Sequence, residues 1–194
     1  MHHIHHTEGI ILGSKNFGEA GRYYNIFTRD LGMISASAQG VRKMSSKLRY
    51  VLQDFSYIKI DLVRGRDFWR VTSASKTNML ENVLVHRETF IVISNISRLL
   101  KRLLTGESAN EALFSDLVNG FAILEKWNGK IDNLRNIEAV LVLRILNHLG
   151  YFASSDTLSP FVTLPFEEEL LSEVPNNRVK ILSEINKALH ETQL

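Results

Sequence analysis

The segment Tyr57-Ile-Lys-Ile-Asp-Leu62 decides how the first part of the chain is interpreted, because aliphatic and charged side chains alternate from Ile58 onward. Successive side chains of a β-strand point to opposite faces of the sheet. We therefore expect the three aliphatic residues to face a core, while Lys59 and Asp61 face solvent. The segment predicts a half-buried strand.

Four other segments in the first 77 residues carry similar strand signals. They lie at 8–15, 22–28, 33–39 and 68–72, and turn-rich sequences such as Asp30-Leu-Gly32 separate them. A sheet of so few strands exposes two unpaired edges, and closure into a barrel is the simplest way to remove them. The sequence thus predicts a small five-stranded barrel.

The segment between the third and fourth predicted strands combines basic and apolar residues. Arg42, Lys43, Lys47 and Arg49 fall within eight positions, and the apolar sequence of 48–55 continues from them. We expect the basic half to be an exposed connector and the apolar half to be a helix that plugs the barrel. A connector anchored in this way would present its cations to a polyanion at reduced entropic cost.

From about residue 79 the apolar residues recur every three or four positions, which predicts amphipathic helices. These helices are expected at 79–104, 108–127, 132–149, 166–173 and 177–191, with a loop at 151–165. The sequence Ser108-Ala-Asn-Glu111 has the pattern of a capping box that opens the second helix. The expected fold class is α+β, with a five-stranded β-barrel domain in residues 1–78 and an α-helical, partner-docking domain in residues 79–194.

The composition is that of a globular protein able to bury a core, since 44% of the 194 residues are hydrophobic and 23% are charged. There is no cysteine, which excludes a disulfide framework and a thiolate-ligated zinc site. No run of about 18 apolar residues is present, so we expect a cytoplasmic protein without membrane association.

Charge is distributed unevenly along the chain. Residues 1–80 contain 12 Lys and Arg against 6 Asp and Glu, whereas residues 81–194 contain 11 against 15. A basic part joined to an acidic part predicts that a polyanion binds to the first part.

Signatures of catalysis are missing from the sequence. There is no Gly-x-x-x-x-Gly-Lys-[Ser/Thr] phosphate loop, no paired-glycine dinucleotide signature and no His-x-x-x-His pair on a predicted helix. His86, His148 and His190 are isolated in helical stretches, where structural or surface roles are more common. The histidines of residues 2–6 are expected to lie in an unordered terminus. We expect no enzymatic activity, no metal and no cofactor.

Cations and aromatic rings are interleaved in the first part of the chain, which favours binding of a single-stranded nucleic acid. Cations follow the phosphates and rings stack on the bases, each stack contributing roughly 1–3 kcal/mol. In a five-stranded barrel of this type the ligand lies across strands 2 and 3, between the 1–2 and 4–5 loops, here about 15–22 and 64–67. The predicted nucleic-acid contacts are Lys15, Arg22, Tyr24, Arg42, Lys43, Lys47, Arg49, Arg64, Arg66, Trp69 and Arg70.

Tyr23, Tyr50, Tyr57 and Phe68 belong to the same interleaved set, and about half of all these rings are expected to fill the core instead of binding bases. No base-reading element is visible in the sequence. Binding should therefore be largely independent of nucleotide sequence and sensitive to salt.

The order of these residues resembles that of the RecO family of bacterial recombination mediators. The first part matches closely, and a second anchor is Leu149-Gly-Tyr151 after a leucine-rich helix that contains Arg144. The matching segments of the first part are Glu8-Gly-Ile-Ile-Leu12, Phe17-Gly-Glu-Ala20, Phe27-Thr-Arg29, Gly32-Met-Ile-Ser35, Gly40-Val-Arg-Lys43, Leu48-Arg49, Leu52-Gln53, Phe55 and Arg64-Gly65.

The resemblance implies an N-terminal OB-fold and an α-helical C-terminal domain without catalytic activity. Members of the family bind single- and double-stranded DNA, anneal strands, and act with RecR to help RecA displace single-strand-binding protein. They also bind the acidic tail of that protein, which requires an apolar slot rimmed by cations. The cations that interrupt apolar helix faces here are Arg98, Lys101, Arg102 and Arg144.

One departure from the family pattern follows Tyr151, where many members carry a cysteine cluster for zinc. This chain has no cysteine, so a zinc site is not carried over.

Two other functions fit the same residues. An RNA-binding barrel would use the same cations and rings, and recognition of the 2′-hydroxyl would separate it from a DNA-binding one. A protein-docking adaptor would instead use the basic face to bind acidic partner tails. The hypothesis that the residues and the resemblance favour is a non-enzymatic mediator of DNA repair and recombination.

Overall fold

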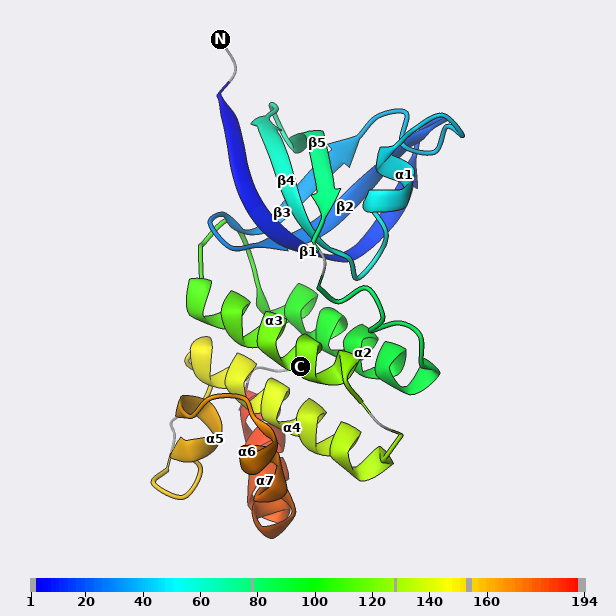
Figure 1. Ribbon diagram of the computed structural model, residues 1–194. Helices are drawn as coiled ribbons and strands as arrows, with labels where there is room; N and C mark the ends of the chain where they lie inside the picture. Colours follow the sequence, from blue (N-terminus) through cyan, green and yellow to red (C-terminus); the bar gives the residue numbers. More distant parts are fainter. Residues whose placement is uncertain (1–2, 78, 128, 153–154, 192–194) are drawn as a thin grey trace. The chain divides into compact units, whose positions relative to one another are not determined.

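Five strands and one short helix make up the first part of the chain, and the strands form a closed barrel in the order β1-β2-β3-β5-β4 (Figure 1). Strands β3 and β5 pair in parallel, whereas every other described strand pair is antiparallel. This is the topology of an OB-fold, and the predicted α+β fold class is confirmed. The elements are β1 (Ile4–Phe17), β2 (Gly21–Thr28), β3 (Gly32–Ala38), α1 (Leu48–Val51), β4 (Tyr57–Arg64) and β5 (Trp69–Lys76).

The structure, a computed structural model, describes residues 3–77, 79–127, 129–152 and 155–191. The chain divides into two units that alternate along the sequence. One comprises Met1–Glu81 with Ser97–Phe114, and the other comprises Asn82–Ile96 with Ser115–Leu194. The division into domains 1–78 and 79–194 stays a prediction, and residue 78 lies outside the described residues.

Strand β1 is long enough to pair on both of its edges. Its first half pairs with β4 and its second half with β2, and the register shifts between Ile11 and Gly13. His5 and His6 lie opposite Leu62 and Asp61 of β4. The expectation of an unordered terminus is therefore wrong for these two histidines, because the edge of β4 supplies backbone partners for them; His2 lies outside the described residues.

The alternation that predicted β4 corresponds to its two faces. Ile58, Ile60 and Leu62 are at most 1% exposed, whereas Lys59 is exposed. Leu52, which follows α1 directly, joins them in the barrel core as the predicted plug. Helix α1 is shorter than predicted and ends at Val51, because the chain beyond it turns back toward β4.

Gly32 closes the β2–β3 hairpin at the predicted turn. Its φ angle is 68°, in the left-handed region that favours glycine. The Thr28 hydroxyl donates to the Gly32 carbonyl at 2.8 Å and accepts from the Leu31 amide at 3.1 Å. A Cβ atom on Gly32 would lie 2.2 Å from the carbonyl oxygen of Ser108, so any side chain here would displace that segment.

Six helices follow the barrel in the described part of the chain: α2 (Arg87–Leu103), α3 (Glu111–Glu125), α4 (Ile131–His148), α5 (Ser159–Thr163), α6 (Glu168–Ser172) and α7 (Val174–Glu191). Helix α2 begins later than the apolar period suggested, and α5 occupies a predicted loop. The cap of α3 is Asn110 and not Ser108, because the Asn110 side-chain oxygen accepts from the Leu113 amide at 3.0 Å. Pro175 is accommodated in the first turn of α7, where its missing N–H leaves no helical bond unmade.

Helix α4 is the centre of the second unit, as its nearly uniform apolar sequence predicted. It contacts α5, α6 and α7. Gly120 of α3 allows close approach to α4, since a Cβ atom there would lie 2.4 Å from Cδ2 of Leu141. None of the described helices is both long and apolar enough to cross a membrane.

Candidate nucleic-acid interface

A row of polar and aromatic side chains crosses four strands on the outer face of the barrel. Lys15 of β1 lies opposite Tyr23 of β2, Tyr23 lies opposite Ser37 of β3, and Ser37 lies opposite Arg70 of β5. Directly paired residues project from the same face of a sheet. Lys15 and Arg70 are exposed, and Tyr23 and Ser37 are half-buried. The register thus brings two predicted cations to the ends of one row; we call this set the cross-strand row.

Three aromatic rings lie side by side at the cross-strand row, of which Tyr23 is a member. We call Phe17, Tyr23 and Phe68 the aromatic ladder. The ring centroids of Phe17 and Tyr23 are 4.5 Å apart, and those of Tyr23 and Phe68 are 4.9 Å apart. Phe17 is 46% exposed and Phe68 is 43% exposed. The rings come from the end of β1, from β2 and from the β4–β5 loop, so this aromatic ladder joins the two loops that flank the ligand face of an OB-fold.

The two aromatic residues predicted as nucleic-acid contacts lie elsewhere. Tyr24 is 1% exposed and Trp69 is 4% exposed, and both belong to the apolar core of the barrel. Tyr24 follows Tyr23 on β2, and neighbours on a strand point to opposite faces. Trp69 is the first residue of β5 and directly follows Phe68, which lies in the β4–β5 loop. Neither Tyr24 nor Trp69 therefore presents a ring face to solvent, and the sequence alone did not show which of two adjacent rings would be buried.

The basic connector after β3 is exposed at all four predicted cations, Arg42, Lys43, Lys47 and Arg49. The Arg42 backbone amide donates to the carbonyl of Ala20 at 3.0 Å, which attaches the connector to the β1–β2 turn. Arg22 is half-buried, and its Nε donates to Asn16 Oδ1 at 3.0 Å. Arg66 is exposed in the β4–β5 loop. These cations remain available to an anionic ligand.

Arg64 is exposed as well, but its charge is already compensated. Its guanidinium pairs with the carboxylate of Glu107, with Nη1 lying 2.6 Å from Oε2. It also lies over the ring of Trp69, whose Nε1 donates to Glu107 Oε1 at 3.1 Å. The hydrogen bond from Arg64 holds the pKa of Glu107 below its ordinary value. A phosphate at Arg64 would have to compete with this carboxylate.

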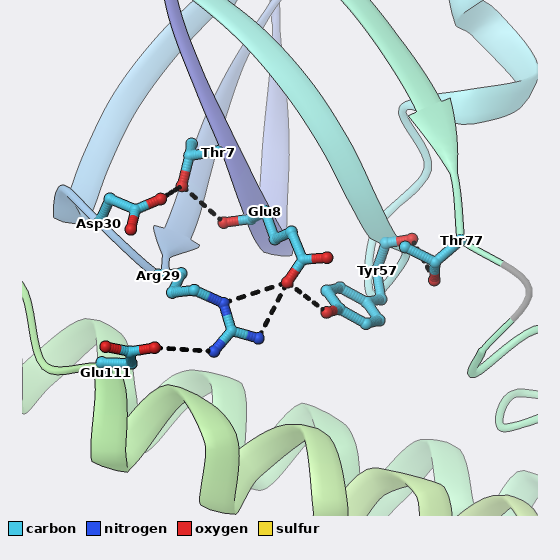
Figure 2. A network of polar contacts seen from close by, with 7 residues as sticks. All are labelled: Thr7, Glu8, Arg29, Asp30, Tyr57, Thr77 and Glu111. Atoms are coloured by element: carbon cyan, nitrogen blue, oxygen red, sulfur yellow. Dashed lines mark hydrogen bonds and ion pairs between the residues drawn. The ribbon is translucent and has the colours of Figure 1, made fainter.

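Another arginine, Arg29, is part of a polar network at one end of the barrel (Figure 2). Its Nε and Nη2 donate to Glu8 Oε2 at 3.1 and 2.9 Å, and the Tyr57 hydroxyl donates to the same oxygen at 2.8 Å. Its Nη1 lies 3.4 Å from Glu111 Oε1. Burial acts to raise the pKa of Glu8, but the hydrogen bonds from Tyr57 and Arg29 outweigh it and hold that pKa below its ordinary value.

Two threonines add further bonds at the same end of the barrel (Figure 2). The Thr7 hydroxyl donates to Asp30 Oδ2 at 2.5 Å, and the Thr77 hydroxyl donates to the carbonyl of Tyr57 at 3.1 Å. The network joins β1, the end of β2, and β4, so its role in the structure is to hold the strand ends together. The alternation of side chains along single strands gave no signal for it.

The predicted partner-binding cations differ in exposure. Arg98, Lys101 and Arg102 of α2 are exposed. Arg144 of α4 is 3% exposed, and its Nη1 donates to Asp116 Oδ1 at 2.7 Å. Its remaining donors bind the backbone carbonyls of Phe161, at 2.9 Å, and Leu164. Arg144 is therefore not a docking residue, because burial and these acceptors occupy its guanidinium.

Asp116 has a second partner in His148, whose Nε2 lies 2.7 Å from Asp116 Oδ2. Burial acts to raise the pKa of Asp116, but His148 and Arg144 outweigh it and hold that pKa below its ordinary value. The three residues form a polar cluster of the helical unit, in which Arg144 is buried and Asp116 and His148 are half-buried. Within the ranges that the structure describes, no group of three or more His, Asp and Glu side chains is arranged to hold a metal ion.

Fold and surface together define a small OB-type barrel with a cationic and aromatic outer face. Residues 1–79 match the family model described as Recombination protein O N terminal. This part of the chain is thus similar to the N-terminal part of the RecO family, and the resemblance expected from the sequence is confirmed.

Curated relatives extend the similarity beyond the barrel. The chain is 29% identical over 148 residues to a protein named DNA repair protein RecO from Heliobacterium modesticaldum, a match that covers 76% of this chain and 52% of that protein. A protein of the same name from Rubrobacter xylanophilus is 28% identical over 148 residues, covering 76% of this chain and 58% of that protein. The one from Dehalococcoides mccartyi is 32% identical over 117 residues, covering 60% and 46%. The chain thus spans about half the length of the curated relatives it matches.

Proposed function

We propose that the barrel binds single-stranded DNA across the outer face of β2 and β3, and that the protein acts without catalysis in DNA repair and recombination. The observation that carries this proposal is the aromatic ladder beside the cross-strand row. Exposed rings and flanking cations are what an unpaired strand requires, because bases stack on the rings and phosphates pair with the cations.

The geometry of the ladder supports an unpaired strand as the ligand. Its neighbouring rings are tilted by 49° and 47° and are not stacked face to face. Part of each ring is thus left for a base, which must be free of its own partner to reach it. Lys15 and Arg70 lie on either side along the strand-to-strand direction. Since none of these contacts reads the edge of a base, binding would be sequence-independent and salt-sensitive.

The wider role is proposed from the relatives, which are named DNA repair proteins. Cations on the connector, Arg42 to Arg49, would neutralise a second strand or a duplex, which would promote annealing. The same activity would help RecA, together with RecR, to replace single-strand-binding protein on DNA in the cytoplasm. For the acidic tail of single-strand-binding protein we propose Arg98, Lys101 and Arg102 as contacts, without the buried Arg144.

Fluorescence anisotropy with a labelled single-stranded oligonucleotide tests the proposal at two salt concentrations. We expect saturable binding that weakens as salt rises, and weaker competition by an RNA of matched sequence. Equal competition by RNA would favour the RNA-binding alternative. Binding of the acidic tail peptide without any binding of DNA would favour the docking adaptor and refute the proposal.

A further inference from the structure

A second basic feature of the barrel is a hollow of about 520 Å³ beside the connector. Three arginines from separate segments line it: Arg22 of β2, Arg42 of the connector and Arg49 of α1. Its wall also contains Tyr24 and Tyr50. The hollow is distinct from the cross-strand row, because Tyr24 belongs to the opposite face of β2 from Tyr23.

The three guanidinium groups form no ion pair within the described residues. Their side-chain contacts are to neutral acceptors, namely the Asn16 amide oxygen for Arg22, the Gly18 carbonyl for Arg42 and the Met44 sulfur for Arg49. Three guanidinium charges without ion pairs around one hollow repel one another in the absence of a bound anion. The arrangement therefore favours a ligand with negative charge.

The hydroxyl of Tyr24 supports the same conclusion. Tyr24 is 1% exposed, and its hydroxyl makes no well-formed hydrogen bond among the described residues, although Arg22 lies toward it. A buried hydroxyl without a partner is costly, and such groups are uncommon in folded proteins. Burial raises the pKa of Tyr24, although Arg22 acts in the opposite direction. A phenol is protonated at neutral pH, so the hydroxyl can donate a hydrogen bond.

The carboxylate of Asp54 also acts to raise the pKa of Tyr24. Asp54 does not line the hollow, and its Oδ1 is buried without a hydrogen-bond partner in the described part of the chain. One carboxylate offsets at most one of the three guanidinium charges. The balance at the hollow stays positive.

We propose that this hollow binds one phosphate group of a nucleic-acid strand, with the three arginines as the clamp and the Tyr24 hydroxyl as a further donor. Guanidinium groups suit this ligand because their forked N–H donors match the oxygens of a phosphate. Tyr50, which is 61% exposed in the wall, offers a ring to the adjoining sugar or base. The inference rests on the proposed DNA binding, but it concerns a separate subsite and can be tested without DNA.

Titration with inorganic phosphate, followed by NMR of the arginine Nε–H signals, tests the site directly. We expect saturable shifts of Arg22, Arg42 and Arg49 in the wild type, and loss of the shift of Arg42, the one of the three that remains, in the double variant Arg22→Gln with Arg49→Gln. The matched control, Arg87→Gln with Arg135→Gln, removes two exposed arginines of the helices and should leave the shifts unchanged. Weak, unsaturable shifts shared by all exposed arginines would overturn the proposal.

Tyr24→Phe tests the hydroxyl alone, since it keeps the ring in the core. We expect phosphate affinity to fall about tenfold, as for the loss of a hydrogen bond to a charged group, without a lower melting temperature. Unchanged phosphate affinity would remove Tyr24 from the site.

Oligonucleotides of one sequence with a 5′-phosphate or a 5′-hydroxyl distinguish the two sources of the phosphate. A terminal phosphate as ligand would make the phosphorylated strand bind more tightly, and the double arginine variant would abolish the difference. An internal phosphate would give equal affinities, and the double variant would reduce the slope of log K against log salt by about 0.7, the value for one phosphate contact on a single strand.

A reduction of about 1.4 would mean that the two arginines bind separate phosphates, which would overturn the clamp. Phosphate shifts without DNA binding would support the clamp and refute the proposed function. DNA binding that the double variant leaves unchanged would refute the clamp and support the proposed function.

Discussion

Replacing two rings of the aromatic ladder, by Tyr23→Ala with Phe68→Ala, should weaken single-stranded DNA binding without changing its salt dependence. Each base stacked on a ring contributes roughly 1–3 kcal/mol. The ring centroids of Tyr23 and Phe68 are 4.9 Å apart, so the two losses of binding free energy should not be fully additive. Phe17 also remains in place as a third ring. We expect a loss of about 2–4 kcal/mol, or about 30- to 1000-fold in Kd.

Fluorescence anisotropy at several salt concentrations measures both the affinity and the salt slope of this variant. The matched control, Lys15→Gln with Arg70→Gln, removes the two cations of the cross-strand row and leaves the ladder intact. It should lower the slope by about 0.7 for each phosphate that no longer has a cation beside it, whereas the ladder variant should keep the slope of the wild type. Because Phe68 is 43% exposed, the variants should remain folded, which thermal melting checks. An affinity within twofold of the wild type in the ladder variant would refute base stacking at this face.

Four further predictions concern the polar pairs and the packing of the helices. Asp116→Ala should lower the free energy of unfolding by about 3 kcal/mol in urea denaturation, because it leaves a buried guanidinium without its carboxylate; a loss below about 1 kcal/mol would contradict this. Since the pKa of Asp116 is held below its ordinary value, its contribution is present at neutral pH and is lost as pH falls below about 4, so wild-type stability should drop there more steeply than that of Asp116→Asn. Gly120→Ala should lower the free energy of unfolding by about 1–3 kcal/mol, because the new methyl group clashes with Leu141. A double-mutant cycle should show a smaller loss when Leu141→Ala is already present. Glu107→Gln should release Arg64 and raise both the affinity for single-stranded DNA and its salt slope, by up to about 0.7; an unchanged slope would mean that Arg64 does not contact phosphate.

The sequence by itself predicted the barrel, its hairpin turn and the central position of α4. These features depend on local patterns. The alternation of Ile58, Ile60 and Leu62 predicted a barrel strand, Gly32 predicted the hairpin turn, and the nearly uniform apolar sequence of 132–149 predicted a central helix. Each pattern reports how a segment divides its side chains between core and solvent, which a single chain shows without knowledge of its neighbours. The exposed cations of the connector could be predicted for the same reason.

Only the tertiary structure decided which rings face outward and which cations are free. Tyr23 and Tyr24 are adjacent and chemically alike, and a shift of one residue in strand parity exchanges their roles. The pairing of β2 with β1 and β3 determines that parity, and it depends on segments that are separate in the sequence. Arg64 and Arg144 were predicted as binding residues because a sequence displays a charge but not the acceptor that folding brings to it. Glu107 and Asp116 are those acceptors, and each lies at least 28 positions away along the chain.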